Sequence, residues 1–226
     1  MKYFLFHCWG GDGRSCWSGW LADQLSVLGC EASGDTRNRS SISVRSVAGQ
    51  HCRLAGEACM VPGSVSGVSS PGSRVLSPDF PETQNPKLET WLAKAREMVP
   101  KFNPADSWVL VGHSLGCPMI LRLLESFKEE ERVKAVVLVA GFAKDLGIGE
   151  IRNFVDHDFD WKKIKKKAEK FVVINSDNDP FIDLSEGKRI AKLLGAQFII
   201  EHNAGHINEG SGFTEYPRLL EIIQSL

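Results

Sequence analysis

The sequence predicts an α/β protein with a mostly parallel sheet and helices on both faces, and three observations support this fold class. Short apolar segments alternate along the chain with helical patterns, as in proteins whose parallel strands are joined by helices. Residues 136–139 (Val-Val-Leu-Val) are apolar at every position, as expected of a strand covered on both faces. Glycines and polar residues follow the strand segments, where such sheets place ligands and catalytic groups.

The individual elements follow from where each apolar run begins and where turn residues end it. Short runs rich in Val, Ile and Phe predict strands, and longer stretches with apolar residues at helical spacing predict helices. The expected order is strand 2–7, helix 17–28, strand 75–77, helix 86–99, strand 107–111, helix 115–128, strand 135–140, strand 171–175, helix 184–194, strand 196–200 and helix 215–226.

Length and composition indicate a single domain over residues 1–226. The chain has 226 residues, 42% hydrophobic and 24% charged, which suffices for one sizeable core but not for two typical domains. The formal net charge of -1 gives no excess of basic residues of the kind that binds nucleic acids or anionic membranes. We therefore expect neither a nucleic-acid partner nor a membrane partner.

One basic run consists of lysines at positions 162, 163, 165, 166 and 167 around Ile164. On a helix, this spacing predicts solvated side chains around one inward apolar residue. Contact with a phosphate or with a partner is the alternative, but charge runs more often form exposed helix faces.

The N-terminus and the cysteines indicate a cytoplasmic protein with free thiols. Residues 3–6 form an apolar run that is too short for a signal peptide or a membrane span. The six cysteines lack paired zinc-binding spacing, and the chain is not a small secreted scaffold. We therefore expect neither a metal site nor disulfide bonds.

Residues 30–74 interrupt the alternation of strands and helices. The segment is rich in Ser, Gly and Arg, poor in large apolar residues, and contains Pro62 and Pro71. Because the entropy of loop closure grows only logarithmically with length, a folded core tolerates such an excursion on its surface. We interpret it as a disordered or loosely packed insertion, although residues 42–47 could form one edge strand.

A candidate nucleophile follows the strand at 107–111. Residues 112–116 read Gly-His-Ser-Leu-Gly and match the nucleophile elbow, in which a serine occupies a strained turn between a strand and a helix. The two glycines let the helix pack close to the strand while Ser114 holds an unfavourable backbone angle. The pattern alone is common, but its place between an apolar strand and an amphipathic helix is specific. A glycine-rich turn with a capping serine is the alternative.

The general base is expected to be His206, because a serine hydroxyl needs an oriented imidazole to take its proton. His206 follows the last predicted strand, and the order serine, acid, histidine along the chain also favours it. His202 is a weaker substitute. His113 adjoins the serine and is expected to point away from it, and His7 is expected to be structural.

The acid is expected in the loop after the preceding strand, where residues 177–180 read Asp-Asn-Asp-Pro. Asp179 is favoured because Pro180 biases its backbone towards an extended conformation. Asp177 is the alternative, and we interpret it as a turn residue that bonds its own backbone.

Negative charge that develops on a substrate oxygen needs backbone donors. One donor is expected at the N–H of Leu115, directly after the nucleophile, and a second at the N–H of Trp9, after the first strand. The candidate substrate-binding residues, which follow strands at the same edge of the sheet, are Trp9, Gly10 and Phe142. The aromatic residues that could line an apolar acyl pocket, each equally consistent with core packing, are Trp9, Trp17, Phe142, Phe154, Phe159 and Trp161.

Several motifs occur together on both sides of the insertion. They are residues 7–11 (His-Cys-Trp-Gly-Gly), the helix with Trp17 and Trp20, residues 78–81 (Pro-Asp-Phe-Pro), Trp91, the elbow, residues 137–140 (Val-Leu-Val-Ala), residues 177–181 (Asp-Asn-Asp-Pro-Phe) and residues 205–208 (Gly-His-Ile-Asn). In this combination the chain resembles the small serine hydrolases grouped with retinoblastoma-binding protein 9 and the YdeN-like proteins. The resemblance implies the α/β-hydrolase fold with a minimal lid, a triad of Ser114, Asp179 and His206, small ester or amide substrates and no cofactor.

Two features depart from the family pattern. The family usually has glycine at the position of Cys8, so the loop that presents the Trp9 amide could differ in shape. Family members also pass almost directly from the first helix to the second strand, so residues 30–74 are an addition. Binding to a retinoblastoma-type pocket needs a Leu-x-Cys-x-Glu motif, and residues 28–32 (Leu-Gly-Cys-Glu-Ala) misplace the glutamate, so that partner is not expected.

The sequence therefore predicts a serine hydrolase that cleaves small carboxylic esters or amides through an acyl-enzyme intermediate. The alternative is a catalytically silent protein of the same fold that serves as a binding module, as Cys8 and the insertion would suit. The enzyme is favoured because all three groups of a triad are present. The sequence names no protein partner.

Overall fold

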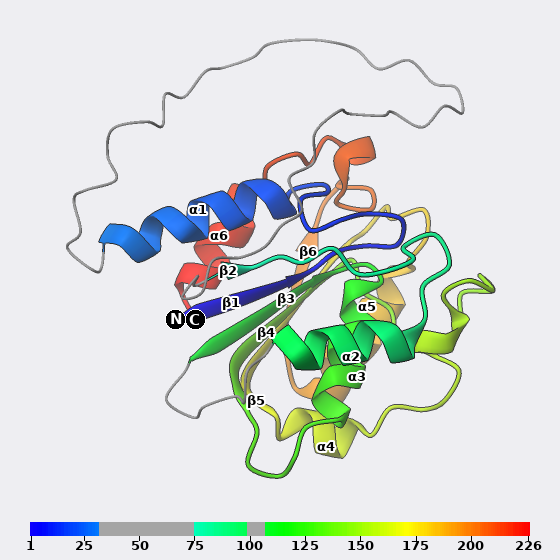
Figure 1. Ribbon diagram of the computed structural model, residues 1–226. Helices are drawn as coiled ribbons and strands as arrows, with labels where there is room; N and C mark the ends of the chain where they lie inside the picture. Colours follow the sequence, from blue (N-terminus) through cyan, green and yellow to red (C-terminus); the bar gives the residue numbers. More distant parts are fainter. Residues whose placement is uncertain (32–74, 99–106) are drawn as a thin grey trace.

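A computed structural model describes residues 1–31, 75–98 and 107–226 of the chain (Figure 1). Within these ranges, six strands form one parallel sheet in the order β2-β1-β3-β4-β5-β6. The predicted α/β class is confirmed. The strands are β1 (Lys2–Phe6), β2 (Val75–Leu76), β3 (Trp108–His113), β4 (Val133–Val139), β5 (Ala168–Ser176) and β6 (Gln197–Glu201).

Helices cover both faces of this sheet, as predicted (Figure 1). One face carries α1 (Ser18–Glu31) and α6 (Pro217–Gln224). The other face carries α2 (Leu88–Met98), α3 (Gly116–Glu125), α4 (Trp161–Lys165) and α5 (Leu184–Leu194). Two short 3-10 helices, η2 (Arg152–Phe154) and η3 (Glu209–Ser211), lie in the connections that follow β4 and β6.

The core has two layers because successive strand side chains point to opposite faces. In β1, Phe4 and Phe6 pack with the helices α2 to α5, whereas Leu5 packs with α1 and α6. All positions of β3 are buried, which explains why its sequence is apolar without alternation. Each large apolar side chain that is fully buried stabilises the fold by about 1.5–3 kcal/mol.

Several boundaries differ from the predicted ones. Helix α1 continues to Glu31, three residues beyond its predicted end, so the first two residues of the predicted insertion belong to it. The remainder of that segment up to residue 74, including the alternative strand at 42–47, lies outside the described residues. Strand β5 begins at Ala168 rather than at 171, because backbone pairing with β4 extends beyond the part of the strand that is buried.

The prediction for the lysine run is correct for Ile164 and wrong for Lys167. Ile164 is fully buried on α4, as expected. Lys167, however, is 4% exposed, and its ammonium group donates to the carbonyl oxygens of Lys128 and Glu129. The long aliphatic part of a lysine can lie in the core while carbonyl oxygens satisfy its charged end.

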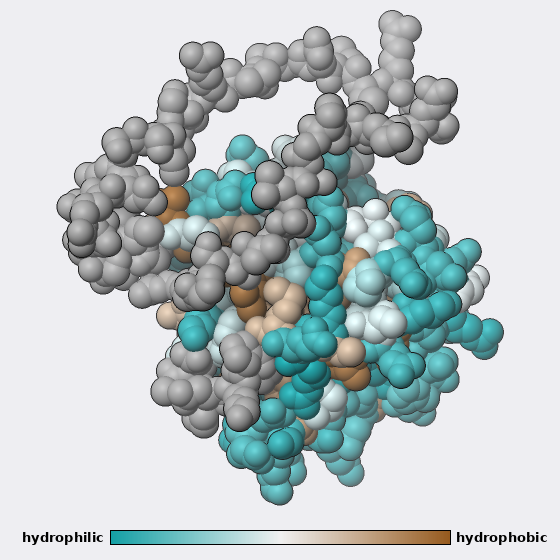
Figure 2. All heavy atoms as spheres, viewed as in Figure 1, coloured by the Kyte–Doolittle hydropathy of each residue, from teal (hydrophilic) through white to brown (hydrophobic). Residues whose placement is uncertain are grey.

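Figure 2 shows the surface of the molecule from the same side as Figure 1. Hydrophilic side chains cover most of the described surface in this view, and apolar side chains are visible only in small patches between them. Among the described residues, no helix has the length and apolar character needed to cross a membrane.

Candidate active site

The turn between β3 and α3 has the strained geometry that the elbow motif predicts. Ser114 has a φ of 52°, in the left-handed region that side chains other than glycine rarely adopt. Its N–H donates to the carbonyl oxygen of Val139 on the neighbouring strand, at 2.9 Å. A Cβ atom at Gly116 would lie 2.3 Å from the carbonyl oxygen of Phe6. Only glycine therefore allows α3 to begin so close to the sheet, directly behind the serine.

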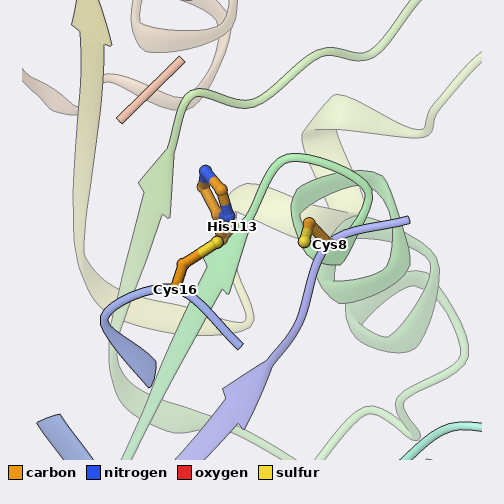
Figure 3. Close-up of side chains that lie close together, drawn as sticks. All are labelled: Cys8, Cys16 and His113. Carbon is orange, nitrogen blue, oxygen red and sulfur yellow. The ribbon is translucent and has the colours of Figure 1, made fainter. Parts of the chain in front are cut away.

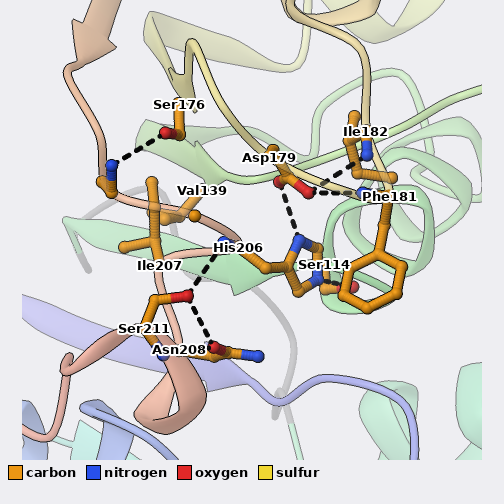
Figure 4. A network of polar contacts seen from close by, with 12 residues as sticks. Ser114, Val139, Ser176, Asp179, Phe181, Ile182, His206, Ile207, Asn208 and Ser211 are labelled. Carbon is orange, nitrogen blue, oxygen red and sulfur yellow. Dashed lines mark hydrogen bonds and ion pairs between the residues drawn. The ribbon is translucent and has the colours of Figure 1, made fainter.

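Ser114, His206 and Asp179 form one continuous chain of polar contacts (Figure 4). His206 Nε2 lies 3.0 Å from Ser114 Oγ, and His206 Nδ1 lies 2.8 Å from Asp179 Oδ2. This geometry suits a hydroxyl that donates to Nε2 and an Nδ1–H that donates to the carboxylate. The Asp179 side chain is 0% exposed and that of His206 is 10% exposed. Because little water reaches this pair, its electrostatic interaction is only weakly screened.

The loop after β5 fixes the direction of Asp179. The second carboxylate oxygen, Oδ1, accepts hydrogen bonds from the N–H groups of Phe181 at 2.9 Å and Ile182 at 3.1 Å. These two bonds, together with the imidazole, satisfy a carboxylate that burial would otherwise destabilise. The sequence favoured Asp179 as the acid because of the neighbouring proline. Its side chain also bonds the backbone of its own turn, a role that the sequence had suggested for Asp177.

His206 is held by contacts that the sequence did not reveal. His113 Nε2 donates to the carbonyl oxygen of His206 at 3.0 Å, and Ser211 Oγ accepts from the His206 N–H at 3.2 Å. Trp17 Nε1 donates to the next carbonyl, that of Ile207, at 2.9 Å. The last residue of β3 and the loop before α1 therefore position the histidine loop next to the serine.

Asp177 and His202 form a second pair beside the first. His202 Nδ1 lies 2.5 Å from Asp177 Oδ2, and Asp177 Oδ1 accepts from the N–H of Asn203 at 2.8 Å. Our interpretation of Asp177 as a residue of its own turn was wrong, because these main partners lie on the loop after β6. The Asn203 hydrogen bond, followed by the one from His202, lowers the pKa of Asp177 below its ordinary value. The His202 side chain is 75% exposed, and its ring contacts Asp177 rather than the serine.

The two backbone groups predicted to bind a substrate oxygen have no acceptor within the described residues. Within the described part of the chain, the N–H groups of Trp9 and Leu115 donate to no protein acceptor. Leu115 precedes the first turn of α3, where the helix dipole also favours negative charge. The Trp9 loop is fixed by two bonds, from Trp9 Nε1 to the Gln84 carbonyl at 3.1 Å and from the Gly10 N–H to the Thr83 carbonyl at 3.0 Å.

The predicted substrate-binding residues differ in their exposure. Trp9 is 38% exposed and Gly10 is also at the surface, but Phe142 is 1% exposed and packs in the core. A substrate contact with Phe142 would require the core to open. Phe181, which the sequence analysis did not single out for this role, is 63% exposed and meets the His206 ring edge-on at 5.1 Å. Core packing accounts for three further aromatic residues considered for the acyl pocket, namely Trp17, Phe154 and Phe159.

The loop after β1 is anchored by His7, which is structural as expected. Its Nε2 accepts from the N–H of Phe80 at 3.0 Å, and its Nδ1 donates to the carbonyl of Cys8 at 2.8 Å. Burial lowers the pKa of His7, in keeping with this neutral form. Next to it, a hydrogen bond between the thiols lowers the pKa of Cys16 to about 4 and raises that of Cys8.

Comparison with known proteins agrees with this architecture. Residues 71–225 match the model of the family described as "Serine hydrolase". The YdeN protein of Bacillus subtilis (strain 168) is 32% identical over 148 residues, which cover 65% of this chain and 77% of YdeN.

Solved structures show the same fold. The crystal structure of YdeN from B. subtilis superimposes with a TM-score of 0.72 at 24% identity, covering 99% of this chain and 97% of that one. A YdeN-like protein from Pectobacterium atrosepticum gives a TM-score of 0.56 at 16% identity, covering 98% and 88% of the two chains. These likenesses confirm the α/β-hydrolase fold, and with the family match they show that the chain belongs to the serine hydrolase family.

Proposed function

We propose that this protein hydrolyses small carboxylic esters or amides through an acyl-enzyme intermediate formed on Ser114. The observation that carries the proposal is the continuous contact from Asp179 through His206 to Ser114, with distances of 2.8 and 3.0 Å. A nucleophile, a base and an orienting acid within hydrogen-bond reach are what acyl transfer to a serine requires.

In the acylation step, Ser114 Oγ attacks the substrate carbonyl carbon while His206 Nε2 takes the hydroxyl proton. Asp179 holds the Nδ1–H and stabilises the positive charge that forms on the imidazole. The negative charge on the substrate oxygen is received by the N–H groups of Leu115 and Trp9, each of which contributes about 100- to 1000-fold to turnover in comparable sites.

The tetrahedral intermediate then collapses, and His206 returns the proton to the leaving alcohol or amine. Water attacks the acyl-enzyme in the same way, with His206 again as the base, and releases the carboxylic acid. No step requires a cofactor. The exposed ring of Phe181 against His206 suits a substrate with a small apolar part.

Labelling with a fluorophosphonate probe tests this function directly, because the probe phosphonylates an activated serine. We expect stoichiometric labelling of the wild type on the peptide that contains Ser114, and none in Ser114→Ala. Ser107→Ala is the matched control, since Ser107 is exposed and lies just before the same strand. Labelling of Ser114→Ala at the wild-type rate would remove Ser114 from the mechanism.

A panel of substrates tests the reaction class. We expect kcat/KM to be measurable for aryl esters with short acyl chains and to be lost in Ser114→Ala. A folded wild-type protein that takes neither the probe nor any ester or amide of the panel would favour the catalytically silent binding module instead.

A further inference from the structure

Three side chains with metal-binding atoms meet beside the nucleophile elbow, and one of them, His113, directly precedes Ser114. They are Cys8 in the loop after β1, Cys16 in the turn before α1, and His113 at the end of β3 (Figure 3). The two sulfur atoms and a ring nitrogen all lie within 4.8 Å of one another. The sequence predicted free thiols for both cysteines, because their spacing of eight positions matches no common metal motif.

The separation of these atoms is close to that in a bound metal site. With metal–sulfur bonds of about 2.3 Å and a metal–nitrogen bond of about 2.0–2.1 Å, ligand atoms at tetrahedral angles lie about 3.5–3.8 Å apart. An inward movement of about 1 Å therefore closes the site, and rotation of the cysteine side chains can supply it. Gly11 leaves space on this side, since a Cβ atom there would lie 2.9 Å from Cys8 Sγ.

The hydrogen bonds around His113 leave the correct nitrogen free for a metal. Its Nε2 is engaged with the carbonyl oxygen of His206 at 3.0 Å, and because a carbonyl only accepts, Nε2 carries the proton. The other nitrogen, Nδ1, therefore has a lone pair and faces Cys16 (Figure 3). A metal-binding histidine typically donates its second N–H to a backbone carbonyl or a carboxylate, as His113 does here.

The position of Cys16 is also fixed by its surroundings. Its backbone has a φ of 56°, in the left-handed region, and its N–H donates to Glu209 Oε1 at 3.0 Å. This backbone strain would be the same with serine or alanine at position 16. The thiol, rather than the backbone, is therefore the feature that distinguishes this position.

We propose that Cys8, Cys16 and His113 bind one thiophilic metal ion, with Zn²⁺ as the expected occupant. Two thiolates and a neutral imidazole form a donor set that Zn²⁺ and similar soft or borderline ions favour. Both sulfurs bind as thiolates and the imidazole is neutral, so the net charge of the site occupied by Zn²⁺ is zero. The three protein ligands leave the fourth tetrahedral position to water.

Such an ion would join the loop that carries Trp9 to the strand that ends beside Ser114. Because the folded chain holds the three ligands together, the ion would bind it more tightly than the unfolded chain, and the unfolding temperature would rise with the metal concentration. The site is separate from the reacting atoms, so this proposal stands or falls independently of hydrolase activity.

The test uses the full-length chain, reduced and metal-free, with the cysteines at positions 30, 52 and 59 replaced by serine to remove competing thiols. Titration with Co²⁺ should give one equivalent of binding with thiolate-to-metal charge-transfer absorption in the near ultraviolet. Zn²⁺ should displace the Co²⁺, and competition with a chromophoric chelator then gives the Zn²⁺ affinity.

Cys16→Ser and Cys8→Ala in this background should weaken Zn²⁺ binding by at least about 100-fold, because each removes one of three ligands. Cys117→Ala removes a thiol outside the cluster and should leave the affinity unchanged. Circular dichroism identifies any variant that fails to fold. The proposal is overturned if Co²⁺ gives no charge-transfer band, or if a folded Cys16→Ser or Cys8→Ala variant keeps the affinity of its parent.

Discussion

Two aspartate–histidine pairs join the loop after β5 to the loop after β6. The two aspartates are two positions apart in the sequence, and the two histidines are four positions apart. The outer pair, Asp177 with His202, has the shorter contact of 2.5 Å, against 2.8 Å for the inner pair, Asp179 with His206. Their surroundings differ strongly. The side chains of the outer pair are 33% and 75% exposed, whereas those of the inner pair are 0% and 10% exposed.

Under the proposed function, a carboxylate next to an imidazole does not by itself make a catalytic base. The inner imidazole has a serine on its other side and a buried partner whose second oxygen is fully bonded. The side chain of the outer imidazole is 75% exposed, so solvent screens its interaction with Asp177. The two pairs therefore differ in burial and in the presence of a serine next to the imidazole, and not in the distance between carboxylate and imidazole.

The largest expected difference comes from removing each imidazole. His206→Ala should lower kcat for an aryl ester by about 10⁴-fold or more, as removal of the base does in other serine hydrolases. His202→Ala should change kcat by less than about threefold, because its ring contacts no reacting group. Steady-state kinetics with both variants measures the difference, and equal losses would show that the comparison is wrong.

The second largest difference in kcat is expected between variants of the two aspartates. Asp179→Asn should lower kcat by about 10⁴-fold, because an amide no longer holds the imidazole in the tautomer that accepts the serine proton. Asp177→Asn is the matched change on the same loop and should retain nearly full activity. Both variants keep the size of the side chain, and the rate of fluorophosphonate labelling gives a second readout. A large loss in Asp177→Asn alone would transfer the acid role to the outer pair.

His113 supports the inner pair only, so its replacement sharpens the comparison. His113→Ala removes the bond to the His206 carbonyl and should lower kcat by about 10- to 100-fold through misplacement of the imidazole, with KM little changed. The assay includes a chelator, so that metal binding does not contribute. Active sites are counted by probe labelling, because a merely structural role would reduce their number and leave the turnover of each unchanged.

The smallest effect is on stability and depends on pH. The hydrogen bonds to Asp177 lower its pKa in the folded protein, so they stabilise the fold above the ordinary aspartate pKa of about 3.9. This contribution is lost as the pH falls through the lower folded value. Asp177→Asn should therefore lower the unfolding temperature at pH 7 by less than about 2 °C, and the difference should shrink as the pH falls below the ordinary aspartate pKa. A difference that grew in acid would contradict this sign.

Much of the fold could be predicted from the sequence because parallel strands buried on both faces are apolar without interruption. The sequence pattern also located Ser114, because its glycine neighbours have a clear steric purpose. The effect of Pro180 on the backbone favoured Asp179 but left Asp177 as an alternative, since both flank the same turn. Burial decides between them, and burial depends on the packing of β5 against β4 and β6.

The residues that sequence reasoning missed act through contacts between distant segments. His113 reaches the backbone of a residue 93 positions away, and Phe181 packs on the same histidine from the acid loop. No periodicity or motif encodes such contacts. The only available signal for Phe181 was an aromatic residue directly after the Asp-Pro pair, and for His113 its place beside the nucleophile.

The approach of α3 to β1 has a consequence for anyone who wishes to engineer new substrate preferences into this protein. At Gly116 the helix lies against the backbone of Phe6, so no side chain is present there that could be trimmed or enlarged to retune the turn. Mutant libraries for directed evolution should leave residues 112–116 untouched and vary the exposed rings of Trp9 and Phe181 instead. Substitutions at these exposed positions can change which substrates bind, while the residues proposed to carry out the reaction stay unchanged.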